Sequence, residues 1–383
     1  MNIVYIIEGM FNSAGTERVL ANKASYFAKK GHQVTVITTD QKQRPYFYQL
    51  PKEVTCIDLD INFLDYQKYP VLLRVFSYFY KSFILRKRLS ALLLKIKPDV
   101  VVSLLLRGAD FLYKIPDGSA KIFEHHLTYD HVEFLSNADK RNKFSRFIYN
   151  FRNKLVQKKL SKYDIFVVLT DEDAEAWKKK LDNVIAISNS ISFQTEKIAD
   201  PKNKIVLAVG RLEYQKGFDT LLEIWTKVTN KNPEWQLHIY GDGQEKEKLQ
   251  SIIQQKGLSE NVRIYPPTKN IEQVLLSSSI YVMSSRFEGF PMVLLEAMEC
   301  GLPCVSFACK CGPRDMILDG ENGFLIENND IDTFVEKLNR LMQDKELRTK
   351  QGISAKQNIQ RFSEQNVMKK WEDLFSKLTS KNG

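Results

Sequence analysis

Two glutamates, Glu288 and Glu296, lie eight residues apart in a largely apolar run. A carboxylate among apolar side chains is costly unless something pairs with it. We predict a strand over 279–285 and a helix over 292–300, with Pro291 at the first helical position. Both carboxylates then lie near a helix N-terminus, where they could accept hydrogen bonds from sugar hydroxyls. Pairing with groups of the protein itself is the alternative.

Two cations lie upstream of the glutamates. Arg211 follows a predicted strand over 204–210, and Lys216 directly precedes Gly217 and the next helix. Cations beside a helix N-terminus suit a diphosphate, because the side chains supply charge and free backbone N–H groups supply directed bonds. Loop cations that contact only solvent are the alternative. If the pair binds a diphosphate, the phosphates lie between the cations and the glutamates.

Backbone positions at the same predicted edge also suit a nucleotide. The amides from Gly289 to Met292 point out of the predicted helix N-terminus. Gly241 and Gly243 fall in a strand-to-helix turn, where small residues let a nucleotide approach the backbone, although a routine turn has the same composition. The loop that contains Pro267 is suited to form a rigid wall beside a base.

The first half of the chain offers two further candidates. His125 and His126 directly follow a predicted strand, so either imidazole could hydrogen-bond a ligand or pack within the loop. Gly15 fits a close backbone approach at a helix start, or a tight structural turn. Its spacing from Gly9 does not match G-x-G-x-x-G, so the dinucleotide fingerprint of a dehydrogenase is missing.

Metal-binding patterns are weak. Two D-x-D triplets occur, but 58–60 ends a predicted strand, and 171–173 opens a predicted helix, where acidic residues favour the macrodipole. Four cysteines within 300–311 lack the CxxC pairs of zinc ribbons, and the odd total of five favours reduced thiols. We expect structural cysteines and no metal site.

The elements that position these residues alternate as strand and helix along the whole chain. The alternation restarts after a polar linker over 189–204, which predicts βαβ units in parallel sheets covered on both faces. We predict an α/β protein with two doubly wound domains, 1–195 and 196–362, and a helix within 363–383 that returns to the first domain. Ligands of such sheets bind outside the carboxyl ends of the strands, in the cleft between facing domains.

Composition and charge narrow the class of protein. At 383 residues with 43% hydrophobic and 27% charged side chains, the chain is not disordered, collagen-like or a disulfide scaffold. Its net charge of +10 comes from two segments, 68–97 with eight Lys or Arg and 140–162 with nine, neither containing Asp or Glu. Both are rich in Phe, Tyr and Leu, which is typical of helices on an anionic membrane surface; solvated helix faces are the alternative.

Other locations and partners have less support. No nucleic-acid-binding motif accompanies the basic segments. The first residues indicate a buried strand and not a signal peptide, and no run of about 18 uncharged apolar residues predicts a membrane span. We therefore expect a cytoplasmic protein that associates peripherally with the cytoplasmic face of the membrane.

In this order the motifs resemble family 4 of the retaining glycosyltransferases, which have the GT-B fold of two facing Rossmann-like domains with a cleft between them. The similarity runs through nearly the whole chain, and Glu-x7-Glu from Glu288 to Glu296 is its most specific part. The matching stretches are "GTERVLANKASYFAKKGHQVTVITT", "KPDVVVSLL", "EHH", "VGRLEYQKGFD", "YGDG", "SRFEGFPMVLLEAMECGLPCVSF" and "CGPRDMILDGENGFLI".

The resemblance implies a role for each candidate. Arg211 and Lys216 would neutralise the donor diphosphate, Glu288 would contact the donor sugar near its reacting face, and Glu296 would bind the ribose hydroxyls. His125 matches the family's Glu-His and would hydrogen-bond the donor sugar, although the neighbouring His126 leaves this assignment open. The remaining positions expected at the donor are Gly15, Gly241, Gly243, Pro267, Gly289, Phe290, Pro291, Met292 and Val293.

Some residues depart from the family pattern. "CKCGPRD" replaces a more common proline-threonine type of loop and has Asp315 where glutamate is more usual, and "ISNSI" lacks a proline often found after that asparagine. Neither departure touches the two glutamates.

The predicted activity is transfer of a hexose from a nucleotide donor, expected to be a UDP-sugar, to a glycan or lipid-linked glycan. The resemblance implies retention of configuration and no metal or other cofactor. The alternatives are a sugar-nucleotide epimerase on a similar fold and a non-catalytic peripheral membrane protein that retains a nucleotide pocket. Sugar, acceptor and linkage depend on pocket shape, which sequence motifs do not specify.

Overall fold

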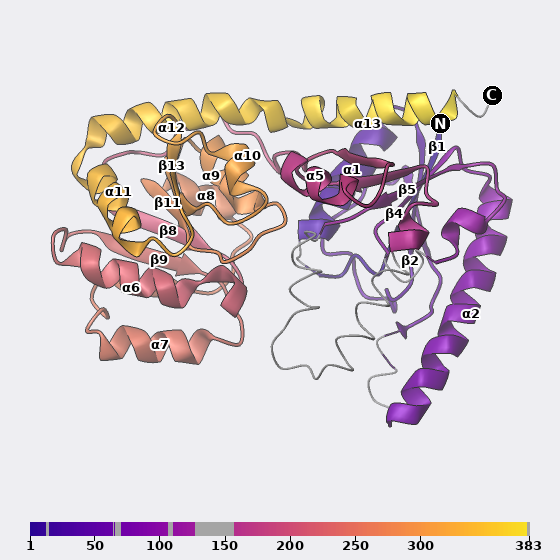
Figure 1. Cartoon of the computed structure of the whole chain (residues 1–383), viewed down its shortest axis with the longest axis horizontal. Coiled ribbons are helices and arrows are strands. Elements are labelled where there is room, and N and C mark those ends of the chain that lie inside the picture. Colours follow the sequence, from indigo (N-terminus) through magenta and orange to yellow (C-terminus); the bar gives the residue numbers. More distant parts are fainter. Residues whose placement is uncertain (13–14, 64, 66–69, 106–109, 127–156, 381–383) are drawn as a thin grey trace. The chain divides into compact units, whose positions relative to one another are not determined.

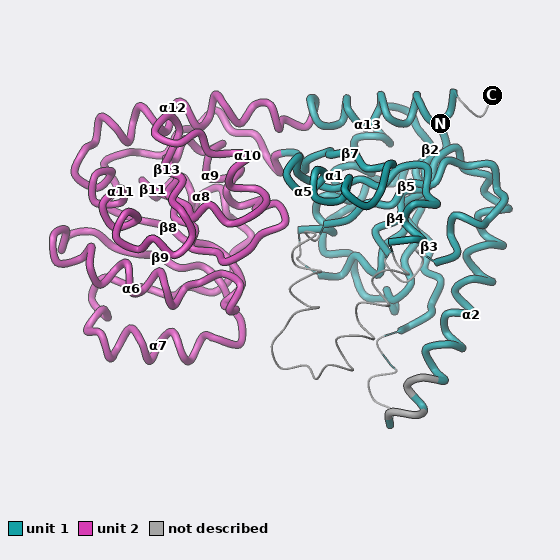
Figure 2. Tube along the Cα trace, in the orientation of Figure 1, with its two compact units in different colours: residues 1–190, 365–383 teal, residues 191–364 magenta. Residues whose placement is uncertain are grey.

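The chain divides into two compact units, shown in Figures 1 and 2. Unit 1 comprises Met1–Ser190 and Gln365–Gly383, and unit 2 comprises Ile191–Glu364. The computed structural model describes residues 1–12, 15–63, 65, 70–105, 110–126 and 157–380. The unit boundaries lie within five residues of the positions 195 and 362 expected from the sequence.

Unit 1 is built on a seven-stranded parallel sheet in the order β3-β2-β1-β4-β5-β6-β7. The strands are β1 Asn2–Ile7, β2 Gln33–Thr38, β3 Val54–Asp58, β4 Val100–Ser103, β5 Ala120–Glu124, β6 Ile165–Val168 and β7 Val184–Ala186. Central strands are buried nearly throughout, which explains their continuous apolar sequences.

Helices cover this sheet, and the last one comes from the end of the chain. They are α1 Gly15–Lys29, α2 Val71–Ile96, η3 Leu112–Lys114, α5 Asp171–Lys178 and α13 Glu364–Thr379. In α13, Trp371 and Phe375 are buried in the core of unit 1, where Phe375 lies 5.3 Å from the ring of Phe27 in α1. This contact secures the tail to unit 1.

Unit 2 is built on a six-stranded parallel sheet in the order β10-β9-β8-β11-β12-β13. The strands are β8 Ile205–Val209, β9 Gln236–Tyr240, β10 Val262–Tyr265, β11 Ile280–Met283, β12 Cys304–Phe307 and β13 Gly323–Ile326. Its helices are η4 Tyr214–Lys216, α6 Phe218–Thr229, α7 Lys246–Gln255, α8 Ile271–Leu276, α9 Met292–Glu299, α10 Pro313–Met316, α11 Ile331–Gln343, α12 Lys345–Ile359 and η5 Gln360–Phe362.

The order of strands in unit 2 places its loops. Because β8 and β11 are neighbours in a parallel sheet, the loops that follow them leave the same edge side by side. These are the loops that carry the two predicted cations and Glu288.

Two sequence expectations concern charged segments, and a third concerns membrane-spanning helices. The acidic triplet 171–173 opens α5, and the hydroxyl of Thr170 accepts a hydrogen bond from the backbone of Asp173, so this D-x-D belongs to a capped helix start. The basic segment 68–97 contains α2, whereas most of the basic segment 140–162 lies outside the described residues. Within the described part of the chain, no helix is long and apolar enough to cross a membrane.

The cysteine cluster is part of the core. Cys300, Cys304, Cys309 and Cys311 are buried, and none of the five cysteines, all in described positions, forms a disulfide. Burial raises the pKa of Cys300 to about 12, so its thiol is protonated at neutral pH.

Candidate active site

The loops after β8 and β11 are joined by hydrogen bonds. The side-chain amide of Gln215 donates to the carbonyl of Phe287 at 2.9 Å, and the backbone amide of Arg286 donates to the carbonyl of Gln215 at 2.8 Å. The hydroxyl of Ser284 donates to the carbonyl of Lys216 at 3.0 Å. These bonds hold the segment before Glu288 against the segment that carries Lys216.

Lys216 and Glu288 form an ion pair at this junction. The Lys216 Nζ donates to Glu288 Oε1 at 2.6 Å, and Glu288 is only 5% exposed. The partner of the buried carboxylate is therefore the lysine predicted to bind a diphosphate. Because an ammonium has three protons, Lys216 can hold this carboxylate and still donate to a phosphate oxygen.

Arg211, the other predicted cation, lies in the same loop but is exposed. Its Nη1 lies 3.1 Å from Glu213 Oε2, and its Nη2 donates to Gln215 Oε1 at 3.3 Å. Gln215 also makes two of the hydrogen bonds that join the two loops. The guanidinium is thus attached to the loop that carries Lys216.

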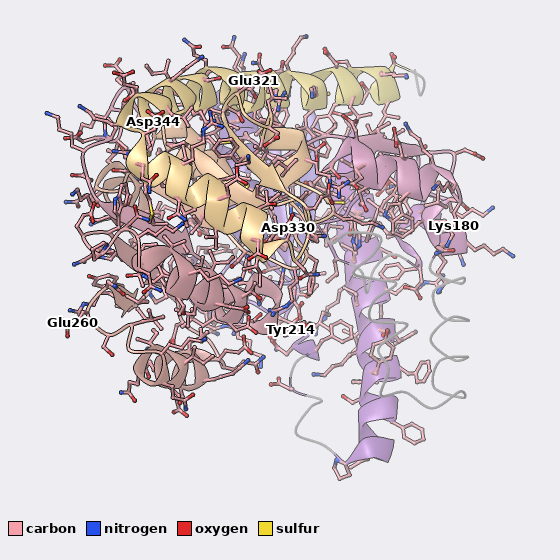
Figure 3. All side chains as sticks on the ribbon, turned by 60° about the vertical axis from the view of Figure 1, so that its left-hand side comes forward. Lys180, Tyr214, Glu260, Glu321, Asp330 and Asp344 are labelled. Carbon is pink, nitrogen blue, oxygen red and sulfur yellow. The ribbon has the colours of Figure 1, made fainter. Side chains whose placement is uncertain are left out.

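Arg286 fixes the same junction, and the sequence analysis did not select it. Its Nη2 donates to both carboxylate oxygens of Asp219, at 2.9 and 3.0 Å. Its guanidinium lies 4.1 Å from the ring centroid of Tyr214, which is in η4 at the edge of unit 2 (Figure 3). Burial would raise the pKa of Asp219, but Arg286 lowers it below its usual value.

Glycines allow the loops to approach one another. A Cβ atom at Gly241 would lie 1.9 Å from the carbonyl oxygen of Gly210, and one at Gly243 would lie 2.5 Å from that of Leu212. The protein's own backbone therefore requires both glycines, a cause that the sequence motif alone did not identify. Pro267 follows β10 at the same edge of the sheet and is exposed.

Helix α9 begins one residue later than predicted. Pro291 is the N-cap residue with ψ 92°, an extended value, so the first helical residue is Met292 and not the proline. The amides of Met292 and Val293 belong to the first turn, where backbone N–H groups lack intrahelical acceptors. Gly289 precedes this turn, and Phe290 is buried with its ring 5.7 Å from that of Phe362.

Glu296 lies in the second turn of α9 and is 1% exposed. The hydroxyl of Ser192 donates to its Oε1. Burial raises the pKa of Tyr281 in the adjacent β11, and Cys304 and the carboxylates of Glu288 and Glu296 raise it further. Glu288 in the loop before α9 and Glu296 in its second turn therefore lie in one region of unit 2.

In unit 1 the two histidines after β5 have different surroundings. The His126 Nε2 lies 2.9 Å from Glu124 Oε1. The ring of His125 lies near aromatic side chains, and its centroid is 6.0 Å from that of Phe166 and 6.3 Å from that of Trp177. Its backbone amide bonds to the next strand, β6, at Val167.

Glu124 belongs to a buried charged group that sequence reasoning missed. The Lys23 ammonium from α1 donates to both of its carboxylate oxygens, and Lys23 Nζ also lies 4.3 Å from the Trp371 ring centroid. Burial alone would raise the pKa of Glu124, but Lys23 and His126 hold it at about 2. Gly15, predicted at the donor phosphates, is the first residue of the same helix α1.

Gly217 provides a test of the loop junction. It has φ +62°, and an added Cβ would lie 2.2 Å from the carbonyl oxygen of Ser284; Gly257 has φ +67° with nothing within 4 Å. Gly257→Ala therefore measures the backbone strain alone, about 1 kcal/mol. We expect Gly217→Ala to lower the free energy of unfolding by about 1–3 kcal/mol more, because the loops must separate. Equal losses in the two variants, measured by denaturant unfolding, would contradict this packing.

Comparison with known proteins identifies the family. Residues 13–195 match the model "Glycosyltransferase Family 4", and residues 189–358 match the model "Glycosyl transferases group 1". The two matches together extend from residue 13 to residue 358. The chain therefore belongs to the glycosyltransferases that these models describe, and it is a glycosyltransferase enzyme.

Individual relatives agree. The amylovoran biosynthesis glycosyltransferase AmsD of Erwinia amylovora is 29% identical over 98% of this chain and 99% of its own. The lipopolysaccharide 1,6-galactosyltransferase of Salmonella typhimurium is 29% identical over 99% of each chain. The crystal structure of S. aureus TarM with fondaparinux, α-GlcNAc-glycerol and UDP superposes with a TM-score of 0.78 at 18% identity, covering 98% of this chain and all of that one. The GT-B fold predicted from the sequence is thereby confirmed.

Proposed function

We propose that this protein transfers a hexose from a UDP-linked donor to a glycan or lipid-linked glycan, with retention of anomeric configuration. The observation that carries the proposal is the Lys216–Glu288 pair at the carboxyl edge of the unit 2 sheet, with Glu288 in the loop that leads into α9. Relatives named for amylovoran and lipopolysaccharide synthesis support a glycan acceptor, and the UDP in the TarM complex supports the nucleotide.

The chemistry proposed for these groups is electrostatic. The leaving nucleotide gains negative charge as the glycosidic bond to phosphate breaks, and an ammonium with helix N-terminal amides stabilises that charge. Glu288 is then the group that accepts hydrogen bonds from the donor sugar, and Glu296 those from the ribose. Because Lys216 and the α9 amides supply the positive charge, we propose that no metal ion is required.

The site of action is proposed to be the cytoplasmic face of the membrane. The support is the basic and aromatic composition of segments 68–97 and 140–162. His125 stays a predicted ligand of the donor sugar, and Arg211 a predicted ligand of the diphosphate.

The test is nucleotide release from a panel of UDP-, GDP- and ADP-sugars, with and without a bacterial lipid-glycan extract. We expect release from a UDP-sugar that depends on the extract and falls at least tenfold in Glu288→Gln. Comparison of product and donor anomers by NMR tests retention, and activity in EDTA tests metal independence. Conversion of donor without acceptor would favour the epimerase, and binding without turnover would favour the non-catalytic alternative.

A further inference from the structure

Four aromatic side chains form an exposed face on the N-terminal half of α2. Phe76, Phe79, Tyr80 and Phe83 are 73, 67, 66 and 66% exposed. Their spacing of i, i+3, i+4 and i+7 puts them on one side of the helix. Rings stand away from the α2 ribbon in Figure 3. A helix in a globular protein normally turns such a face toward a core, whereas this one is exposed among the described residues of the chain.

The opposite side of α2 is the one that packs in unit 1. Leu85, Leu89 and Leu93 are fully buried in its core, and all three lie in the C-terminal half of the helix. The preceding half extends past the ends of the strands in Figure 1. The helix is therefore anchored by its second half, and none of the four aromatic side chains belongs to the core that the described residues of unit 1 form.

Hydrogen bonds fix the rotation of the helix about its axis. Lys81 donates to the carbonyl of Asn62, and Arg88 Nη1 donates to the carbonyls of Leu59, at 2.5 Å, and Asp60, at 3.2 Å. These cations lie between the buried and the exposed faces. The buried leucines and these hydrogen bonds together fix the orientation of the aromatic face in unit 1.

The charged residues beside the aromatic face indicate what kind of partner would fit it. Arg86 and Lys87 are exposed in the turn after Phe83, and residues 71–96 contain no Asp or Glu. Aromatic rings followed by cations, without acids, suit the boundary between acyl chains and anionic head groups. A second copy of the chain would bring like charges together, which disfavours a homodimer through this face.

We propose that the α2 face formed by Phe76, Phe79, Tyr80 and Phe83 inserts into an anionic bilayer, with Arg86 and Lys87 on the lipid head groups. This inference rests on the proposed membrane location of the enzyme, and it names the surface that makes the contact. The rings supply affinity for any bilayer interface, and the two cations supply preference for anionic lipid.

A tryptophan reporter tests insertion directly. The four native tryptophans, Trp177, Trp225, Trp235 and Trp371, are at most 2% exposed, so they contribute a constant background. We expect the fluorescence of Phe79→Trp to shift to the blue on addition of phosphatidylglycerol vesicles. Phe47→Trp, at an aromatic position of unit 1 that is 41% exposed and outside α2, is expected to show no shift.

Vesicle sedimentation tests the contribution of the face. We expect Phe76→Ser/Phe79→Ser/Phe83→Ser to lower partition onto phosphatidylglycerol vesicles at least tenfold. Arg86→Gln/Lys87→Gln should lose the preference for phosphatidylglycerol over phosphatidylcholine, and Ile353→Ser, at an exposed apolar position of unit 2, should match the wild type. Unchanged unfolding midpoints confirm that the variants fold.

The outcomes separate this inference from the proposed function. Undiminished vesicle binding by the triple serine variant would overturn the inference, as would wild-type protein that ignores vesicles and self-associates through this face. Turnover of a UDP-sugar with a water-soluble glycan acceptor should survive in the triple variant. Absence of that turnover in the wild type, with vesicle binding intact, would refute the proposed function and leave the membrane surface standing.

Discussion

Replacing Lys216 with alanine is expected to lower kcat/KM for the donor sugar nucleotide at least tenfold. The Lys216 Nζ lies 2.6 Å from Glu288, which is in the loop that leads into α9, and a departing diphosphate is proposed to gain charge beside this pair. A hydrogen bond to a charged group contributes roughly 1.5–3 kcal/mol. Since about 1.4 kcal/mol corresponds to a factor of ten in rate, loss of one such bond in the transition state gives at least that decrease. Steady-state kinetics with a UDP-sugar measures it.

Because Lys216 and Glu288 form an ion pair, a loss of activity in Lys216→Ala alone has two explanations. Lys216→Ala also leaves the buried Glu288 carboxylate without its cation, so the decrease could come from a displaced glutamate. Affinity for UDP distinguishes the two, because UDP has the diphosphate but no transferred sugar. If Lys216 binds the diphosphate, Lys216→Ala weakens UDP binding, whereas Glu288→Gln leaves it equal or tighter while turnover falls.

A double variant completes the test. If Lys216 only positions Glu288, adding Lys216→Ala to Glu288→Gln has no further effect on turnover and none on UDP affinity, and the diphosphate role is then refuted. Lys227→Ala is the matched control, since Lys227 is in α6 of the same unit and pairs with Asp332 at the surface. We expect its kinetics and UDP affinity to equal those of the wild type.

The strands were largely predictable because parallel sheets bury both faces. "NIVYII" and "QVTVIT" are short runs rich in β-branched residues and bounded by polar turns, and β1 and β2 have the same bounds as those runs. The first residues of helices were less predictable than the bounds of the strands. At Pro291 the ring fixes φ near −65°, which suits a helix, but ψ is free to be extended, and the helix starts one residue later.

The site was predictable only as a set of positions. Strand order places Lys216 and Glu288 at one edge of the sheet, but nothing in the motifs pairs residues that are 72 positions apart. Arg286 gave no signal, because an arginine in a loop is usually solvated. Lys23 and Glu124 were recognisable in the sequence, because Lys23 lies among the buried apolar residues of α1 and Glu124 ends a buried strand. Two opposite charges at apolar positions are a reason to expect a buried pair.

The second large expected effect is a loss of stability when the buried Lys23–Glu124 pair is broken. We expect Glu124→Gln to lower the free energy of unfolding by about 3–5 kcal/mol, because it leaves the Lys23 ammonium buried without a counter-charge. The double variant Lys23→Met/Glu124→Leu should recover much of this loss, since it removes both charges. Denaturant unfolding of the full chain measures both, and Asp373→Asn, in a solvent-exposed pair of α13, should leave the transition unchanged.

The same pair predicts how stability depends on pH. The pKa of Glu124 is about 2 in the folded protein, below its ordinary value of 4.5, so its contribution is present above pH 4.5 and is lost as the pH falls toward 2. A depression of that size corresponds to about 3 kcal/mol. The wild type should therefore lose more stability than the double variant Lys23→Met/Glu124→Leu between pH 5 and about pH 2. Parallel pH profiles for the two proteins would mean that Glu124 titrates normally in the folded state, and that Lys23 does not hold it ionised.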